Sequence, residues 1–342
     1  MKSLLGLLLV CASCLVARAD NALNTQGLPE GAVGVIQLNV TNFNETKVGQ
    51  AIKDAIPDNQ EAALLKQELG IEPSTDIKEL IFGVYPGPDG KVAQKDPFIA
   101  GLIRGNFQPK QIESFAQSNG LRPKAIGNCN GWDIAEIQKA LGSETAKKAA
   151  ANEGMLLTGP TNALGFASMS LVERTVEALG QTTGTVKIPA GSEAYLAKAQ
   201  KPWAFMAFDG TKMEDVDKAG IKTVTVVAGE SPTHVQVGVY LQFKSKDLAA
   251  DTANKIKGLQ MMATLATSTS EEGKTAEQIN QQHLVADLLQ GIKVDSQDDL
   301  ISINFEFPVD KAIQAIKAAI DKAQAQAQAG QATTPFLKVK KK

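Results

Sequence analysis

The sequence contains few of the residues on which most catalytic and metal sites depend. Only two histidines and three cysteines occur among its 342 residues. Most zinc sites take several ligands from these two residue types, so a multi-ligand zinc site is not expected. The sequence also lacks a run of about 18 consecutive apolar residues, which argues against a polytopic membrane protein.

An excess of positive charge is lacking as well. The chain has 35 Lys and Arg residues against 37 Asp and Glu residues, for a net charge of −2. Nucleic-acid-binding domains normally carry a basic face or stripe, so we do not expect a nucleic-acid partner.

Aromatic residues make up only 5% of the chain, and Trp132 and Trp203 are its two tryptophans. Sites for sugars and quaternary amines usually stack the ligand on several aromatic rings, so we do not expect such a site. Trp203 follows Pro202 at the start of an apolar strand and is expected in the core. Trp132 lies beside Asp133 in a segment rich in Asn and Gly and is expected at the surface.

The chain does contain enough apolar material for a substantial core, since 43% of its residues are hydrophobic and 21% are charged. This composition argues against global disorder. The length favours two domains, or one domain built from two similar halves.

The N-terminus has the three-part plan of a secretory signal peptide. A lysine precedes the apolar stretch Leu4–Val16, and small residues follow at Ala17 and Ala19. Such small residues suit the pockets of a signal peptidase, and the apolar stretch is too short to span a bilayer comfortably. We expect residues 1–19 to be a signal peptide cleaved after Ala19. The mature protein is then secreted or periplasmic, with no transmembrane span.

Two other interpretations of the N-terminus stay open. In the first, a lipoprotein signal leaves Cys11 or Cys14 as the acylated first residue. The sequence fits this less well, because Cys14 has no Leu three positions upstream and Val10 is large for the position before Cys11. In the second, the segment remains in the membrane as a signal anchor.

Removal of the signal peptide leaves Cys129 as the one remaining cysteine and a net charge of −4. A single thiol cannot form an internal disulfide, so stability must come from the core. Cys129 lies in the turn-rich segment Gly127–Gly131, far along the chain from either histidine. We expect a buried or turn-packed thiol rather than a nucleophile.

Periodic apolar residues predict strands that alternate with helices. The predicted strands are Val33–Val40, Glu79–Tyr85, Phe98–Phe107, Ala163–Ala167, Trp203–Phe208, Lys222–Ala228, His234–Phe243, Ile292–Val294 and Leu300–Phe307. The predicted helices are Thr46–Ile56, Asn59–Leu69, Gln111–Ser118, Leu171–Leu179, Met213–Lys218, Lys246–Leu265, Thr275–Gln290 and Val309–Ala327. The turn cluster Pro86–Gly90 predicts an antiparallel hairpin. Pro109 is expected to start one helix and Ser170 to cap another, and Pro123–Ile134 is expected to be extended.

A similar order of strand, turn, strand and helix occurs in both parts of the chain and indicates an internal repeat. Each hairpin has one apolar face that the following helix can cover. The sequence therefore predicts an α+β fold of two similar ferredoxin-like (split β-α-β) halves, with antiparallel sheets covered by helices. The expected organisation is a signal peptide (1–19), an N-terminal half (20–181), a C-terminal half (192–322) and a low-complexity tail (323–342).

The tail is rich in Ala and Gln and ends with four lysines. This composition is typical of a disordered segment. A weak contact of the Lys-rich tip with an anionic surface is the alternative.

Known catalytic motifs are not found, and we expect no catalytic, cofactor-binding or metal-binding residues. His234 and His283 have no nucleophile or metal-ligand partner at the usual spacing, so both are expected to be surface histidines. Asp295–Asp299 lacks the Gly and Glu of an EF-hand loop and is expected to be a hairpin turn. Met261 and Met262 are expected to fill core, with an apolar groove as the alternative.

Two Asn-x-Thr sequons, at Asn39 and Asn44, matter only if the chain passes through a eukaryotic secretory pathway.

The order of elements resembles that of secreted proteins of unknown function from planctomycetes and related bacteria. The segments that carry the resemblance are Leu28–Val35, which has the Leu-Pro-x-x-Ala-type strand start of those proteins, Phe205–Phe208 and Leu300–Phe307. The resemblance implies a location in the bacterial envelope and transfers no catalytic residue.

These observations favour an exported bacterial envelope protein with a non-enzymatic binding or assembly role and an unknown protein or envelope partner. One alternative is a hydrolase, which requires two carboxylates that converge in a cleft. Another is a carrier of an apolar ligand, which requires a cavity of several hundred Å³ between the halves, lined by Leu, Ile, Val and Met.

Overall fold

A computed structural model describes residues 23–55, 66–67, 70–93, 97–106, 108–140, 154–159, 163–181, 184, 186–267, 279, 283 and 286–332. The predicted signal peptide (1–19), most of the predicted helix Asn59–Leu69, much of the predicted helix Thr275–Gln290 and the Lys-rich tip of the tail lie outside these residues.

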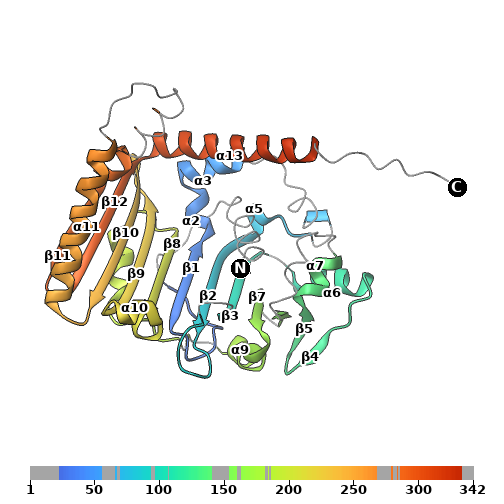
Figure 1. Cartoon of the computed structure of the whole chain (residues 1–342). Helices are drawn as coiled ribbons and strands as arrows, with labels where there is room; N and C mark the ends of the chain where they lie inside the picture. Colours follow the sequence, from blue (N-terminus) through green and yellow to red (C-terminus); the bar gives the residue numbers. More distant parts are fainter. Residues whose placement is uncertain are drawn as a thin grey trace.

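Strands, mostly in consecutive pairs, are interspersed with helices along the described chain (Figure 1). The strands are β1 (Gly34–Asn39), β2 (Ile77–Tyr85), β3 (Phe98–Gly105), β4 (Lys124–Ile126), β5 (Cys129–Asp133), β6 (Gly154–Thr158), β7 (Ala163–Ser168), β8 (Ala204–Asp209), β9 (Ile221–Glu230), β10 (His234–Phe243), β11 (Ile292–Gln297) and β12 (Leu300–Pro308). The α-helices are α2 (Val40–Asn44), α3 (Lys47–Ala55), α5 (Pro73–Asp76), α6 (Pro109–Ser118), α7 (Ile134–Ala140), α9 (Val172–Leu179), α10 (Glu214–Lys218), α11 (Lys246–Thr267) and α13 (Val309–Ala332). Short 3-10 helices are η1 (Met169–Leu171), η2 (Ser192–Lys198) and η3 (Gly210–Lys212).

The described strands form one twelve-stranded sheet in the order β11-β12-β10-β9-β8-β1-β2-β3-β7-β6-β5-β4. Each neighbouring pair in this order is antiparallel. The predicted α+β class with a large antiparallel sheet is therefore confirmed. The two predicted halves share this sheet, because β1 pairs directly with β8 at its middle.

The ferredoxin-like topology is not confirmed, and the arrangement is corrected to a single antiparallel sheet. In a split β-α-β unit the helix carries the chain back along the sheet, so the strands that it joins run parallel. Here α2 and α3 stay at the end of β1, and the chain returns through β2 antiparallel to β1. In the second half, η3 and α10 likewise stay at the end of β8, and the chain returns through β9 antiparallel to β8.

The two predicted halves share part of their order of elements. Each has a strand and short helices, then a hairpin and a longer helix, and later a strand that lies beside the hairpin. In the first half β4, β5, α7 and β6 come before that last strand. In the first half β7 lies next to β3, and in the second β12 lies next to β10. Asn39 and Asp209, the last residues of β1 and β8, both accept a hydrogen bond at the start of the helix that follows.

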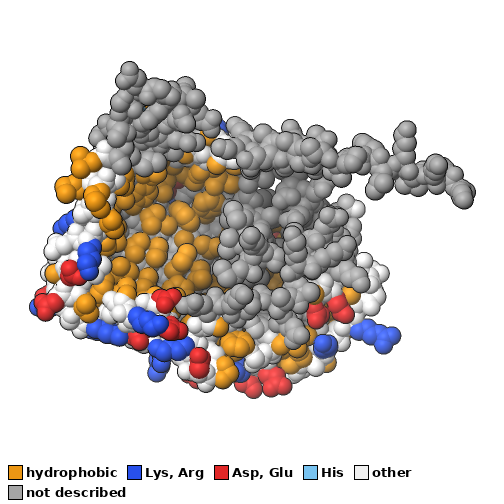
Figure 2. All heavy atoms as spheres, viewed as in Figure 1, with side chains coloured by type: hydrophobic (Ala, Val, Ile, Leu, Met, Phe, Trp, Pro, Cys, Tyr) orange, Lys and Arg blue, Asp and Glu red, His pale blue; other side chains and the backbone are white. Residues whose placement is uncertain are grey.

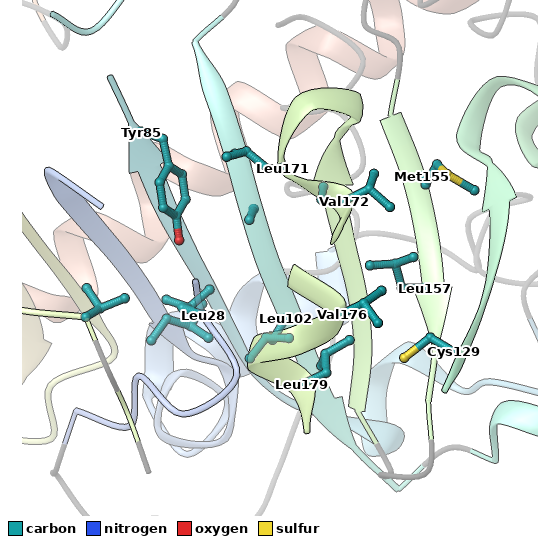
Figure 3. Close-up of a cluster of buried hydrophobic side chains, with 14 of the residues drawn as sticks. Leu28, Tyr85, Leu102, Cys129, Met155, Leu157, Leu171, Val172, Val176 and Leu179 are labelled. Carbon is teal, nitrogen blue, oxygen red and sulfur yellow. The ribbon is translucent and has the colours of Figure 1, made fainter. Parts of the chain in front are cut away.

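The first half buries apolar residues on both faces of the sheet. On one face Leu28, Leu102 and Val176 come together beneath α9 and the N-terminal segment (Figure 3). Tyr85 belongs to this core, and its hydroxyl donates to the carbonyl oxygen of Pro29 at 2.8 Å. The opposite face carries a second core, which includes Ile112, Phe115 and Ala116 of α6.

The second half also carries apolar residues on both faces of the sheet. Cross-strand register places Met206, Val226, Val239 and Ile303 in one row. The opposite face alternates with this row and holds a buried core of Phe205, Ala207, Val227 and Tyr240, beside the polar residues Thr225 and Ser302. The helix α11 packs over β11, β12 and β10 on the face of the Met206 row, and α13 packs against α3 at the strand ends.

The tail departs from the expected disorder over its first part. The helix α13 continues through Ala332, so residues 323–332 are helical. Ala has the highest helix propensity and Gln is also favourable, which explains why this low-complexity segment extends the helix.

Candidate functional site

An apolar cavity of about 330 Å³ lies where α2, α3 and α13 meet the end of the sheet. Its described lining residues come from both predicted halves: Leu38, Asn39, Val40, Phe43, Val48, Ile52 and Leu80 from the first, and Trp203, Val235, Ala312 and Ile316 from the second. No charged side chain is among these lining residues, and Asn39 is their one polar member. The cavity is therefore suited to a hydrocarbon group rather than to an ion.

The first wall of the cavity is the turn from β1 into α2. Asn39 caps α2, since its Oδ1 accepts from the backbone N–H of Asn42 at 2.8 Å. The Asn42 side chain in turn donates to the carbonyl oxygen of Pro202 at 2.7 Å. These bonds tie α2 to the segment that leads into β8, and so fix Phe43 on the cavity wall.

The second wall is aromatic. The backbone N–H of Asn39 donates to the carbonyl oxygen of Trp203, and the backbone N–H of Trp203 donates to that of Ala228. Both bonds hold Trp203 one residue before β8. Its ring lies edge-on to Phe43, with ring centroids 5.1 Å apart and an interplanar angle of 63°. The prediction that Trp203 packs in the core is confirmed in part, because the half-buried ring also lines the cavity.

The third wall is α3, which is held in place from the other half of the chain. Glu230, at the end of β9, is only 6% exposed. Its carboxylate oxygens accept from the backbone N–H groups of Lys47 and Val48 at the start of α3. A carboxylate at a helix N-terminus is stabilised both by these bonds and by the helix dipole.

Beyond the cavity, the apolar face of β8, β9, β10 and β12 is open (Figure 2). We call this surface the open apolar face. Its half-buried residues are Met206, Phe208, Val224, Val226, Val237, Val239, Leu241, Ile303 and Phe305. Val235 of β10 lies on the same side of the sheet and lines the cavity, so the two apolar surfaces are continuous along β10. Apolar area of this extent is typical of binding sites rather than of inert surface.

The remaining predicted residues lie elsewhere. Cys129 is buried at 3% exposure, as expected, and burial raises the pKa of its thiol. His234 starts β10 as predicted and is half-buried, with Nδ1 at 2.9 Å from the Thr233 hydroxyl. His283 is an exposed helical residue. None of the three lines the cavity.

The acidic segment forms the predicted hairpin turn between β11 and β12. Asp298 adopts a φ of +54°, a backbone conformation that Asp tolerates better than most residues. Asp298 pairs with Lys246, and Asp299 pairs with Lys222 at 3.2 Å. The Lys222 ammonium lowers the pKa of the Asp299 carboxyl through hydrogen bonding. Among the described residues, no group of three or more His, Cys, Asp or Glu side chains is placed to hold a metal ion.

Several expectations need correction. Trp132 is not at the surface but 2% exposed, in the core with Ile112 and Leu164, because β5 pairs with β6 inside the sheet. Met261 and Met262 are not core residues but exposed on α11. Ser170 does not cap α9, since it lies inside η1.

The two sequon asparagines differ in exposure, since Asn39 is half-buried whereas Asn44 is buried. Asn39 is the α2 cap, and Asn44 is only 3% exposed. The role of Asn39 was missed at the level of sequence. A strand that ends on Asn before a short polar segment is a helix-start signal that identifies it.

No helix in the described part of the chain has the length and apolar character needed to cross a membrane. No protein-family model and no curated protein matches the sequence. The fold is similar to solved structures of TP0453 from Treponema. Crystal form I is 8% identical over 87% of this chain and 98% of TP0453, with a TM-score of 0.42. Crystal form IV is 9% identical over 86% of this chain and 97% of TP0453, with a TM-score of 0.45. At such low TM-scores, no conclusion about function rests on this likeness.

Proposed function

We propose that this is an exported, non-enzymatic protein of the bacterial envelope that binds the hydrocarbon chain of a lipid-like ligand in the cavity between its two halves. The main observation in support is the apolar lining of the 330 Å³ cavity, to which both halves contribute residues. The size lies within the range of small-molecule sites.

The volume sets the length of chain that fits. At about 30 Å³ of liquid volume for each water-sized group, the cavity has room for roughly eleven such groups. A methylene is of similar size, so a single chain of about twelve carbons matches the space. Each buried methylene contributes about 0.8 kcal/mol, which is sufficient for binding without a charged partner.

A hydrolase is the weaker candidate. It requires two carboxylates that converge in a cleft. Three hollows lined by described residues carry no Asp or Glu on their walls.

The same proposal has three further parts. The protein is exported, it is similar to secreted planctomycete proteins, and its two halves arose by duplication. The signal-like N-terminus supports export, and the common plan of the two halves supports duplication.

Native mass spectrometry of the mature protein with added dodecanoate tests the function. One bound chain per protein is expected. In Ala312→Phe the new ring occupies the cavity, because Ala312 is on its wall, and binding is expected to be lost. Ala318→Phe, on an exposed position of the same helix, is the matched control and should bind normally. Absence of binding to the wild-type protein, or equal binding to Ala312→Phe, would contradict the proposal.

A further inference from the structure

The strand β11 forms one edge of the sheet, since β12 is its one neighbour among the described strands. The edge strand at the other end, β4, has three residues, whereas β11 has six. A long, open edge strand is a template for pairing with another chain, and a very short one is not. The edge at β11 is therefore the better candidate for an interaction surface.

Alternate residues of β11 turn their backbone groups outward, away from β12. The carbonyl oxygen of Gly291, just before β11, accepts from the backbone N–H of Glu306 in β12 at 3.1 Å. In an antiparallel ladder the backbone groups of every second residue face the same neighbour. The odd-numbered residues of β11 therefore bond to β12, and the even-numbered residues Ile292, Val294 and Ser296 face outward.

Most of these outward backbone groups have no partner among the described residues. The side-chain amide of Gln260 in α11 donates to the carbonyl oxygen of Ile292 at 2.9 Å. A carbonyl oxygen can accept a second hydrogen bond, so Ile292 can still pair with another strand. No described residue bonds to the outward backbone groups of Val294 or Ser296, and Ser296 is exposed. The edge can therefore accept a further strand.

Two opposite charges flank Val294 along β11. The side chain of Val294 is buried in the core beneath α11. Lys293 and Asp295 are exposed and alternate with it, so they lie on the opposite face of the sheet. Lys293 makes a long contact of 3.5 Å with the exposed Glu306, and no described cation pairs with Asp295. Both charges are thus available to a strand that pairs with this edge.

A second copy of this chain fits the pattern in one register. Outward residues must pair with outward residues, so a two-fold axis near the middle of the strand passes at Lys293, Val294 or Asp295. An axis at Lys293 or at Asp295 places identical charges opposite each other, which is unfavourable. With the axis at Val294, Lys293 of each copy instead lies opposite Asp295 of the other. Ile292 then pairs with Ser296.

The helix α11 supplies apolar surface beside the same edge (Figure 1). Lys246 near its start pairs with Asp298 just beyond one end of β11, and Gln260 reaches Ile292 at the other end. The helix therefore runs alongside the whole strand. A two-fold axis through β11 brings the two α11 helices together on one face of the joined sheet. Exposed apolar side chains such as Met261, which is 64% exposed, can then be buried between them.

We propose that β11 is a homodimer interface, at which two copies of the chain pair antiparallel about Val294 and join their sheets into one. The partner is a second copy because the charges of the strand complement themselves in this register. This inference goes beyond the proposed function and does not depend on it, so ligand binding in the cavity and dimerisation through β11 can fail separately.

Analytical ultracentrifugation of the mature protein tests the interface, and a monomer–dimer equilibrium is expected. Lys293→Asp and Asp295→Lys each place like charges opposite each other, so each should weaken dimerisation by at least about tenfold. Mixed in equal amounts, the two variants should form a dimer with one copy of each, because opposite charges then face each other again. Glu177→Lys changes the charge by the same amount as Asp295→Lys at an exposed position on α9, and it should dimerise normally.

Ser296→Pro tests the backbone pairing. The substitution removes an outward N–H, and proline is tolerated on an edge strand where this group faces solvent. The variant should be monomeric, with a melting temperature close to that of the wild-type protein. A wild-type protein that is monomeric at its highest soluble concentration would overturn the proposal. So would a dimer that Ser296→Pro and both charge variants leave intact. Should Ser296→Pro not fold, the mixture of the two charge variants still decides the question.

Discussion

Glu230 and Val48, which are 182 residues apart in the sequence, are joined by a hydrogen bond of 3.1 Å from the Val48 backbone N–H to the carboxylate. The other carboxylate oxygen accepts from the backbone N–H of Lys47 at 2.7 Å. One buried side chain of the second half thus holds the helix that forms a cavity wall in the first. The shape of the cavity therefore depends on contacts between the halves.

Glu230→Ala should destabilise the protein by about 2 kcal/mol, because two amide donors at the start of α3 lose a charged acceptor. Urea unfolding measures this difference. Glu177→Ala, at an exposed position on α9, is the control and should change the free energy of unfolding by less than about 0.5 kcal/mol. Equal effects of the two substitutions would show that Glu230 does not hold α3.

Alkaline pH should weaken the fold through the tyrosines. Burial raises the pKa of Tyr85 far above its ordinary value of 10.0, although the Arg174 guanidinium acts in the opposite direction. Burial also raises the pKa of Tyr195 and of Tyr240. The stabilising contribution is complete below pH 10.0, where the tyrosines of the unfolded chain are also neutral, and it is lost as the pH rises above that value.

The measurement is the free energy of unfolding between neutral pH and pH values above 10.0, alongside the tyrosinate absorbance of the native protein. Above its unfolded-state pKa, each tyrosine with a raised pKa lowers the free energy of unfolding by at most about 1.4 kcal/mol per pH unit. Tyr85→Phe should show a shallower decline than the wild-type protein. Tyrosinate absorbance that appears near the ordinary pKa without unfolding would refute the burial of these hydroxyls.

Trp132→Phe should change stability by less than about 1 kcal/mol, although Trp132 is fully buried. Its Nε1 has no hydrogen-bond partner among the described residues, so the loss of apolar contact is offset by removal of an unsatisfied donor. Trp132→Ala, which leaves a cavity, should cost about 3 to 5 kcal/mol. Thermal unfolding compares the stability of the two variants. An equal loss of stability in both would show that removal of the unsatisfied donor does not compensate for the lost apolar contact.

Cys129 should react slowly with a thiol reagent in the native protein. The thiol is buried and its pKa is raised by burial, so little thiolate is accessible. Reaction is expected to become fast after unfolding in urea. Rapid modification of the folded protein at neutral pH would place Cys129 at the surface instead.

Local patterns in the sequence predicted the elements well. Pro109 starts α6 as expected, and Ile112, Phe115 and Ala116 are its buried residues. The turn cluster Pro86–Gly90 lies between antiparallel strands β2 and β3, also as predicted. These features depend on residues close together in the chain, and periodicity and turn chemistry therefore reveal them.

Pairing between distant segments could not be predicted in the same way. The pairing of β1 with β8 joins residues about 170 positions apart, such as Gly34 and Phe208, and it merges two expected sheets into one. Trp132 was placed at the surface because its neighbours are polar, whereas pairing of β5 with β6 buries it. A cavity of several hundred Å³ was the requirement of the carrier alternative, and the aromatic wall of Phe43 and Trp203 at the observed cavity depends on that same distant pairing.

Contact quenching of Trp203 by dodecanoate that carries bromine at its far carbon tests the central claim most directly, in the Trp132→Phe background. A bromine atom quenches an indole only at close range, so quenching reports a chain inside the cavity. The expected result is saturable quenching that Ala312→Phe abolishes and Ala318→Phe preserves. Quenching that is absent, or that is equal in both variants, would show that the hydrocarbon chain does not occupy this cavity.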